Sequence, residues 1–370
     1  MRAVFAIKSM NTAGGGAERV LAEVVNGLAG RGHQLAVVTF DGPGQSFYPL
    51  SDAVPRFDLE VGRVGASTPR GELLAVLPRL RRTVTSLRPD VVVGFMHSMF
   101  VPLGFALLGS RLRLVASEHV GMQHYCTVPL QRALLETVPW LTVATTIPSD
   151  EVRAAFPPRL RRRMVAIPNP VAIPRVDEHG QREDGRRGGV ILSVGRFFAE
   201  KNHSDLVAAF AQVSADFPGW TLRLAGDGEL RETLERQVGE LELGLRVQFA
   251  GTVRDIAGEY AAADIVAVPS RHESFGLVTA EALAAGRPVV GFADCPGTRE
   301  LVQHEINGLL ADAQHERACS LADALRRLMA DEGLRARLGE AGPESVARFA
   351  PAAVVDRWEQ LLLRCTALRS

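Results

Sequence analysis

The chain has 370 residues, of which 46% are hydrophobic, so it is long enough for two domains that each bury a core. Its formal net charge is zero, which argues against a dedicated nucleic-acid-binding protein. The charges are nevertheless distributed unevenly between the two halves of the chain. Residues 1–173 carry 19 Lys and Arg against 12 Asp and Glu, and the remaining residues carry 23 Lys and Arg against 30 Asp and Glu. The basic first half suits an anionic partner such as a lipid headgroup or a phosphorylated acceptor, and ordinary surface charge explains it equally well.

The cysteines indicate neither a disulfide framework nor a zinc site, because the four lie far apart in the sequence. A strand-like run follows Met1 directly, without the pattern of a signal peptide. No stretch reaches the ~18–20 apolar residues that a membrane span needs. We therefore expect a cytoplasmic protein, with peripheral contact at the inner face of the membrane left open.

In chain order, short apolar runs alternate with helical patterns through the first half. The expected helices include Ala17–Ala29 and Glu72–Leu87. The expected strands are Val4–Ile7, Leu35–Thr39, Val91–Phe95, Leu114–Ser117, Leu141–Ala144 and Val165–Ile167. Such alternation predicts a parallel sheet that is covered by helices on both faces.

A charged, glycine-containing segment, residues 174–189, breaks this pattern and is typical of an exposed linker. The alternation then restarts, and the tail over residues 317–368 is almost wholly helical in pattern. The strands expected here are Val190–Val194, Leu222–Ala225, Val247–Phe249, Ile265–Val268 and Val289–Gly291, with helices over Ser204–Phe217, Leu230–Leu241 and Ala280–Ala285. We predict an α/β chain of two doubly wound domains facing a cleft, residues 1–173 and 190–352, with ligands at the carboxyl ends of the strands.

Two candidate sites follow strands of the first half. Glycines at 14, 15 and 16 open a helix, where Gly15 and Gly16 would let the backbone approach an anion or an acceptor; a plain turn is as good an explanation. His119 follows the strand Leu114–Ser117, at the edge where ligands bind, although a lone histidine is more often structural.

The loop after Val190–Val194 contains Arg196 and Lys201, five residues apart. Lysine is rare in this chain, which has only Lys8 and Lys201. Two cations at the start of a helix can neutralise a diphosphate, whereas a solvated turn is the simpler alternative.

The loop after Ile265–Val268 is the most informative, because Glu273 lies in it and Glu281 follows in the first turns of the next helix. Helix-start amides suit a phosphate and carboxylates suit hydroxyls, and a sugar nucleotide offers both groups. Asp227 and Glu229 superficially resemble a metal-binding pair, but they are explained by the helix that follows them. The chain has no Asp-x-Asp sequence, so we expect no metal.

Together these motifs resemble the retaining glycosyltransferases of family 4, which have the GT-B fold with two Rossmann-like domains. The likeness covers most of the chain and is strongest in the second half. Pro170 departs from the glycine that is usual in the family's Ile-Pro-Asn-Gly-Val segment. The segments that carry the resemblance are 14–19, 167–171, 193–202, 273–281, 294–302 and 307–309.

The resemblance implies a role for each candidate residue. Arg196 and Lys201 would hold the donor diphosphate, Glu281 the ribose hydroxyls, and Glu273 the donor hexose. His119 would touch the transferred sugar across the cleft, and residues 353–370 would form a helix that packs back on the first domain. The backbone amides implied to line the sugar and phosphates are those of Phe275, Gly276 and Leu277.

The resemblance further implies transfer of a hexose or N-acetylhexosamine from a nucleotide-sugar, with UDP as the expected nucleotide, to a glycan or a lipid-linked acceptor. No cofactor is expected beyond this donor. A small soluble acceptor, such as a sugar phosphate or a natural product, is the alternative, and a non-catalytic sugar-nucleotide-binding module is a further one. Arginines over residues 69–88 would suit an anionic membrane or a solvated basic helix face.

Overall fold

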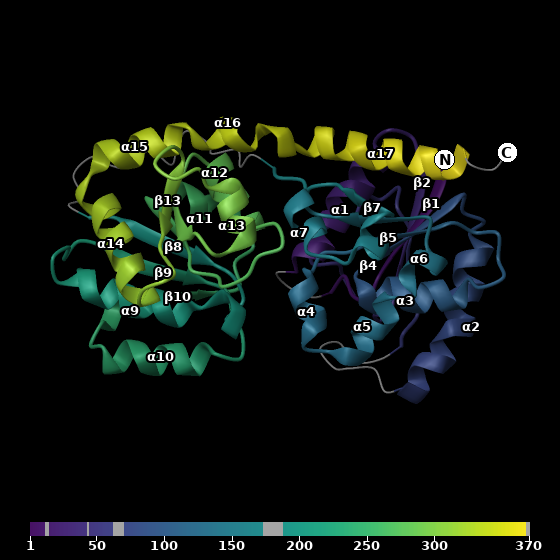
Figure 1. The fold of residues 1–370 in the computed structure, drawn as a ribbon, viewed down its shortest axis with the longest axis horizontal. Coiled ribbons are helices and arrows are strands. Elements are labelled where there is room, and N and C mark those ends of the chain that lie inside the picture. The colour runs from purple at the N-terminus through teal and green to yellow at the C-terminus, as the bar shows by residue number, and fades with distance from the viewer. Residues whose placement is uncertain (12–14, 43, 62–69, 173–187, 368–370) are drawn as a thin grey trace. The chain divides into compact units, whose positions relative to one another are not determined.

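The computed structural model describes residues 1–11, 15–42, 44–61, 70–172 and 188–367, with the side chains of residues 70–75 left aside (Figure 1). Gly14 and most of the expected linker 174–189 lie outside the described residues. These residues form two compact units, Met1–Pro170 with Pro351–Ser370, and Val171–Ala350, which are described separately below. Among the described helices, none is long and apolar enough to cross a membrane.

Unit 1 is built on a seven-stranded parallel sheet in the order β3-β2-β1-β4-β5-β6-β7. Strands such as β4 are buried along their whole length, as expected for a sheet covered on both faces. The strands are β1 (Arg2–Ile7), β2 (Gln34–Thr39), β3 (Arg56–Asp58), β4 (Val91–Phe95), β5 (Leu114–Ser117), β6 (Ala144–Ile147) and β7 (Met164–Ala166).

Nine helices among the described residues belong to unit 1. They are α1 (Gly16–Ala29), α2 (Arg70–Ser86), α3 (His97–Ala106), α4 (Met122–Cys126), α5 (Pro129–Leu135), α6 (Val138–Leu141), α7 (Asp150–Ala154), α8 (Pro158–Arg161) and α17 (Pro351–Ala367). The last of them, α17, packs against α1 (Figure 1). Its buried Trp358 stacks on Phe95 of β4, with ring centroids 5.8 Å apart. Burying side chains of this size contributes a few kcal/mol each, which fixes α17 on this unit.

Unit 2 repeats the architecture with a six-stranded parallel sheet in the order β10-β9-β8-β11-β12-β13. Its strands are β8 (Val190–Val194), β9 (Thr221–Ala225), β10 (Val247–Gly251), β11 (Ile265–Val268), β12 (Val289–Phe292) and β13 (Gly308–Ala311). Its α-helices are α9 (His203–Ser214), α10 (Arg231–Glu240), α11 (Ile256–Ala262), α12 (Leu277–Ala284), α13 (Pro296–Leu301), α14 (Arg317–Ala330), α15 (Glu332–Glu340) and α16 (Gly342–Val346).

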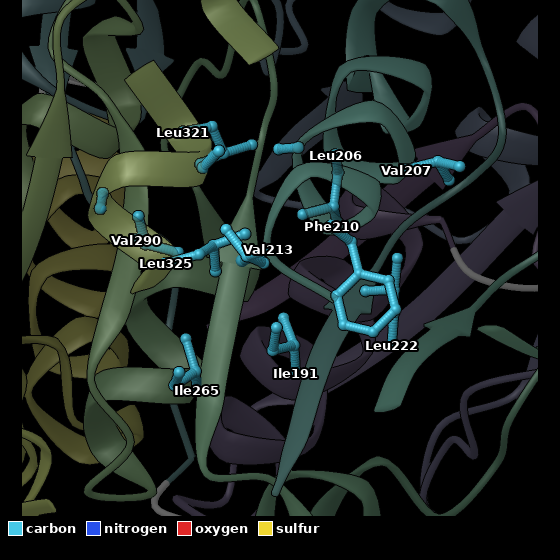
Figure 2. Packing of buried hydrophobic residues seen from close by; sticks show 14 of the residues in the cluster. Ile191, Leu206, Val207, Phe210, Val213, Leu222, Ile265, Val290, Leu321 and Leu325 are labelled. Carbon is cyan, nitrogen blue, oxygen red and sulfur yellow. The ribbon is translucent and has the colours of Figure 1, made fainter. Parts of the chain in front are cut away.

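The larger core of unit 2 lies between the sheet and the helices α9 and α14. Figure 2 shows Phe210 of α9 above Ile191 and Leu222 on the strands β8 and β9, with Leu325 of α14 on the same layer. The opposite face of the sheet packs against α11 and α12, and α16 packs on α12. Both faces of the sheet are therefore covered, and the loops at its edges are the places left for a ligand.

The sequence patterns locate most elements within a few residues, with one clear error. The strand predicted over Leu141–Ala144 is wrong, because α6 ends at Leu141 and β6 begins at Ala144. A continuous apolar run cannot by itself separate the end of a buried helix from a buried strand. The patterns also missed two short edge strands, β3 and β13.

Each sheet changes its winding direction at one place. In unit 1 the chain runs outward one way from β1 and the other way from β4, and in unit 2 the same happens at β8 and β11. Ligands of doubly wound sheets bind outside the carboxyl ends of the two strands at such a switch point. The loops that follow β8 and β11 are therefore the first place to look for a site in unit 2.

Candidate functional site

The loop after β8 is shaped by two residues with positive φ. Gly195 leaves the strand, and Asn202 ends the short 3₁₀ helix Ala199–Lys201 in the left-handed conformation, with φ 55°. Asparagine is among the few residues that adopt this conformation readily. Its side-chain amide donates hydrogen bonds to Asp205 Oδ2 at 2.6 Å and to the carbonyl of Pro269 at 3.3 Å. This second bond ties the loop after β8 to the loop after β11.

The two loops bring a predicted cation and a predicted carboxylate into contact. Lys201 Nζ lies 2.5 Å from Glu273 Oε1, although the residues are 72 positions apart in the sequence. Ser270 Oγ donates to the same carboxylate oxygen at 2.7 Å. The two charged side chains are 27% and 13% exposed, so the pair is sheltered but still open to a ligand. Sequence reasoning did not identify Ser270, whose role follows from the fold alone.

The segment after Glu273 is packed tightly against the start of α13. The amide of Gly297 donates to the carbonyl of Glu273 at 3.0 Å, and a Cβ at Gly297 would lie 2.8 Å from that same oxygen. Phe275 is buried against Phe349, with ring centroids 5.2 Å apart. Gly276 has φ 82° and precedes α12. Glycine is therefore required at 297 for close approach and at 276 for the turn into the helix.

Leu277 and Glu281 lie on α12, the helix that this turn begins. The Glu281 side chain is 4% exposed, and Tyr260 Oη donates to its Oε2 at 2.9 Å. A buried carboxylate needs hydrogen-bond partners, and Tyr260 supplies one of them. Tyr260 comes from α11, and no sequence signal pointed to it.

Arg196 lies at the start of the same loop as Lys201 but takes a different position. It is exposed, and its guanidinium lies 4.8 Å from the centroid of the Phe198 ring. A stacked arginine keeps its fork of N–H donors free to turn toward an anion. The structure thus places Lys201 and Glu273 in direct contact, with Arg196 on the solvent side of their loop.

Two histidines that were not singled out in the sequence border this pair. His203 is buried at the start of α9 against the ring of Phe197, and burial lowers its pKa to about 4, with the charge of Lys201 acting in the same direction. His272 lies next to Glu273 in the chain, and burial lowers its pKa as well. Both imidazoles are therefore neutral near pH 7, which leaves Lys201 as the cation beside Glu273.

In unit 1, His119 follows β5 and is held by a chain of side chains. Its Nε2 lies 2.9 Å from Ser117 Oγ, which accepts a hydrogen bond from Thr146 Oγ1 at 2.9 Å. Its ring stacks on Phe95, with centroids 5.1 Å apart. Burial lowers its pKa to about 4, so this imidazole is also neutral near pH 7. Gly15 caps the N-terminus of α1, and Gly16 is the first residue of that helix.

The residue before His119 is a fully buried carboxyl group. Glu118 accepts hydrogen bonds from Tyr125 Oη and from the amides of His119 and Val120, at 2.9 and 3.1 Å for the amides. Burial outweighs these bonds and raises the pKa of Glu118 to about 7. Glu118 thus fixes the backbone on which His119 sits, and the sequence analysis gave it no such role.

No group of three or more His, Cys, Asp or Glu side chains is arranged to hold a metal ion in the described part of the chain. The Asp227–Glu229 pair lies before α10, where Asp227 accepts a hydrogen bond from the amide of Gly228 at 2.8 Å. This contact lies within the turn that precedes α10.

Comparisons with known proteins cover almost the whole chain. The family model described as glycosyltransferase family 4 matches residues 14–175, and the model described as glycosyl transferases group 1 matches residues 177–345. An exopolysaccharide phosphotransferase of Streptomyces coelicolor is 35% identical over 208 residues, which are 56% of this chain and 21% of that relative. A lipopolysaccharide core biosynthesis glycosyltransferase of Rhizobium meliloti is 29% identical over 96% of this chain and 97% of its own length.

Solved structures agree on the fold. A sucrose-phosphate synthase from Thermosynechococcus elongatus is 25% identical and superposes with a TM-score of 0.81, with both chains covered completely. HepE of Anabaena, solved in complex with UDP-glucose, is 21% identical with a TM-score of 0.80, covering 98% of this chain and 100% of its own. The family models, the relatives and the two Rossmann-like sheets identify the chain as a glycosyltransferase of the GT-B fold, in the family 4 and group 1 class.

Proposed function

We propose that this enzyme transfers a hexose or N-acetylhexosamine from a UDP-sugar to a glycan or lipid-linked acceptor, with retention of anomeric configuration and without a metal ion. The contact between Lys201 Nζ and Glu273 Oε1, at the switch point of unit 2, carries the proposal. It supports a site that offers a cation to a diphosphate and a carboxylate to sugar hydroxyls within the same few ångströms.

The first requirement of the reaction is that the negative charge on the leaving group is stabilised. When the bond between the anomeric carbon and the diphosphate breaks, negative charge develops on the departing nucleotide. Lys201 and Arg196 would meet this charge, and the amides of Phe275, Gly276 and Leu277 would add fixed dipoles. Preorganised donors of this kind contribute several kcal/mol to transition-state stabilisation. This supply of positive charge supports the proposal that no metal is required.

Retention requires that the acceptor oxygen attacks the face of the sugar from which the diphosphate leaves, or that a covalent intermediate forms. We favour same-face attack, in which the new bond from the acceptor oxygen forms as the bond to the diphosphate breaks. The acceptor's proton passes to an oxygen of the leaving phosphate. Glu273 is already engaged by Lys201 and Ser270, which suits a carboxylate that orients a hydroxyl better than a free nucleophile.

The other candidate residues suit the donor's remaining groups. Glu281, a buried carboxylate with Tyr260 as a partner, suits the ribose hydroxyls. His119 is neutral and hydrogen-bonded to Ser117, so it suits a sugar hydroxyl rather than a phosphate. Gly15 and Gly16, at the start of α1, would let the backbone approach the ligand.

The choice of nucleotide and of acceptor class is based on similar proteins. UDP is favoured because HepE, which shares the fold, was solved with UDP-glucose. A glycan acceptor is favoured by the lipopolysaccharide core glycosyltransferase, which aligns over 97% of its length. A small soluble acceptor is the second candidate, because the sucrose-phosphate synthase superposes over the entire chain.

A thermal-shift screen of UDP-, GDP- and ADP-sugars, followed by turnover of the best donor, tests the proposal. We expect stabilisation by a UDP-sugar, slow release of UDP, and an α-linked product from an α-linked donor. Assays with sugar phosphates and with lipid-linked glycans separate the two acceptor classes. Preference for GDP- or ADP-sugars would contradict the choice of nucleotide, and a product of inverted configuration would contradict retention.

A further inference from the structure

A buried cluster of charged side chains lies in unit 1 beside the carboxyl ends of β1 and β2. Asp41, two residues after β2, is 3% exposed, and its Oδ2 lies 3.0 Å from NH2 of Arg56 on β3. The Arg56 side chain is 11% exposed, and its Nε donates to Asp58 Oδ1 at 2.7 Å. A charge taken out of water is costly unless it is paired and hydrogen-bonded, so these three side chains depend on one another.

The carboxylate of Asp41 also holds the backbone that follows β1. Its Oδ2 accepts hydrogen bonds from the amides of Met10 at 2.6 Å and Asn11 at 3.3 Å. The carbonyl of Met10 accepts from the amide of Phe47 at 2.8 Å. We call residues 8–11 the β1 loop. Hydrogen bonds from amides to a carboxylate are charge-assisted and strong, so Asp41 fixes the direction in which the β1 loop leaves the strand.

Arg56 adds a second connection between the β1 loop and the cluster. Its NH1 donates to Asn11 Oδ1 and to Ser46 Oγ, at 2.9 Å in both cases, while NH2 and Nε donate to Asp41 and Asp58. The planar fork of an arginine suits several partners at once, whereas a lysine carries a single point charge. The β1 loop is therefore held through its backbone by Asp41 and through a side chain by Arg56.

The β1 loop lies at the edge where a ligand of unit 1 is expected. It follows β1, and β1 and β4 are the strands from which the chain winds in opposite directions. Ligands of doubly wound sheets bind outside the carboxyl ends of such strands. Gly15 and Gly16, at the start of α1, are the next described residues after the loop. The cluster thus fixes backbone at the edge on which the proposed function depends.

We propose that Asp41 and Arg56 are positioning residues for sugar transfer, which hold the β1 loop in the conformation that meets the substrates. Both act through Met10 and Asn11, and neither is a catalytic residue. The inference rests on the proposed function, which brings a ligand to the edge of unit 1 where the β1 loop lies. Misplacing a substrate-positioning segment by about 1 Å can cost about 100-fold in rate, so remote residues of this kind affect turnover.

Replacement of Asp41 tests the proposal on the whole enzyme. D41A removes the oxygen that accepts the two amides, whereas D41N keeps an oxygen that can accept them. We expect kcat at saturating substrates to fall at least about tenfold in D41A and to stay within about threefold of the wild type in D41N. D90A is the matched control, because Asp90 Oδ2 accepts from the amide of Arg2 at 2.8 Å, at the opposite end of the same strand. D90A should lose stability without a fall in kcat.

Hydrogen exchange gives a readout that does not depend on turnover. Exchange of the backbone amides over residues 8–11 should become at least about tenfold faster in D41A and stay slow in D41N and D90A. All measurements are made below the thermal transitions of the variants, which melts establish.

R56K provides a second test that remains available if D41A does not fold, because it keeps the positive charge in the cluster and removes the fork. We expect R56K to lower kcat at least about threefold. R31K is its control in the same unit, where Arg31 contacts Asp356 and Glu359 at 2.6 Å each, and it should keep the kcat of the wild type.

A wild-type kcat in D41A, or an equal fall in D41A, D41N and D90A, would overturn the proposal, because loss of the amide acceptor would then not be what slows transfer. Unchanged exchange over residues 8–11 in D41A would overturn it too, as would equal kcat in R56K and R31K. Absence of sugar transfer by the wild type would instead contradict the proposed function, and the exchange experiment would still decide whether Asp41 holds the β1 loop.

Discussion

Lys201 and Glu273 form a salt bridge of 2.5 Å between two loops that follow neighbouring strands, β8 and β11. Without a ligand, the carboxylate holds the ammonium group in one position, although the lysine side chain is long and flexible. In the proposed reaction, the donor diphosphate would compete for the same ammonium, and Glu273 would turn to sugar hydroxyls. The proposal therefore gives separate expectations for the two residues.

Replacement of Lys201 by alanine should lower kcat/KM for the UDP-sugar by about 10²–10³, because one charged donor to the leaving group is lost. K201R keeps the charge and should retain more activity than K201A. Steady-state kinetics with release of UDP as the readout measure both. Comparable activity in K201A and the wild type would remove Lys201 from the site.

Glu273→Gln should lower the rate without trapping a glycosyl-enzyme, because in the proposed reaction Glu273 orients the sugar and does not bond to it. Intact-protein mass spectrometry after incubation with donor is the measurement. A mass increase equal to one sugar on the wild type or the variant would instead show a covalent intermediate.

Full activity should persist in excess EDTA, because Lys201, Arg196 and helix-start amides supply the positive charge at the leaving group. Turnover before and after chelation, with Mg²⁺ and Mn²⁺ added back, checks this. Activity that is lost in EDTA and returns only with a divalent ion would contradict the metal-free reaction.

Gly297→Ala should disturb the site, because its Cβ would meet the backbone of Glu273 and Phe275 at 2.8 Å. The clash is with main-chain atoms, so the loop itself must move, and we expect a fall in kcat of tenfold or more with a loss of about 1–3 kcal/mol in stability. Gly239→Ala is the matched control, since nothing lies within 4 Å of its Cβ. It should be neutral or slightly stabilising. Equal activity of the two variants would show that the loop tolerates the shift.

The placement of two candidate residues could be predicted from the sequence because the strand-loop-helix pattern puts them at the carboxyl edge of the sheet. Lys201 and Glu273 are of this kind, each following a clear buried strand. Their partners could not be found in the same way. Ser270 and Tyr260 are ordinary residues in the sequence, and only the register of β8 and β11 and the packing of α11 bring them to the carboxylates. Burial likewise sets the protonation of His203, and no spacing reveals burial of a single side chain.

Burial of Glu118 makes the stability of the folded chain depend on pH. Burial raises the pKa of this carboxyl to about 7 from 4.5, so the folded state binds its proton more tightly than the unfolded chain does. The contribution of Glu118 to the free energy of unfolding is therefore fully present at pH 4.5 and below. It is lost as the pH rises from about 4.5 to about 7, by up to roughly 3 kcal/mol.

Glu118→Gln cannot ionise, so this variant should gain stability relative to the wild type as the pH rises across this window. Thermal melts at a series of pH values measure the difference, which isolates Glu118 from the buried histidines that both proteins share. A constant difference between Glu118→Gln and the wild type from pH 4.5 to pH 7.5 would show that Glu118 is ionised in the folded enzyme, with Tyr125 and the two amides compensating for its burial.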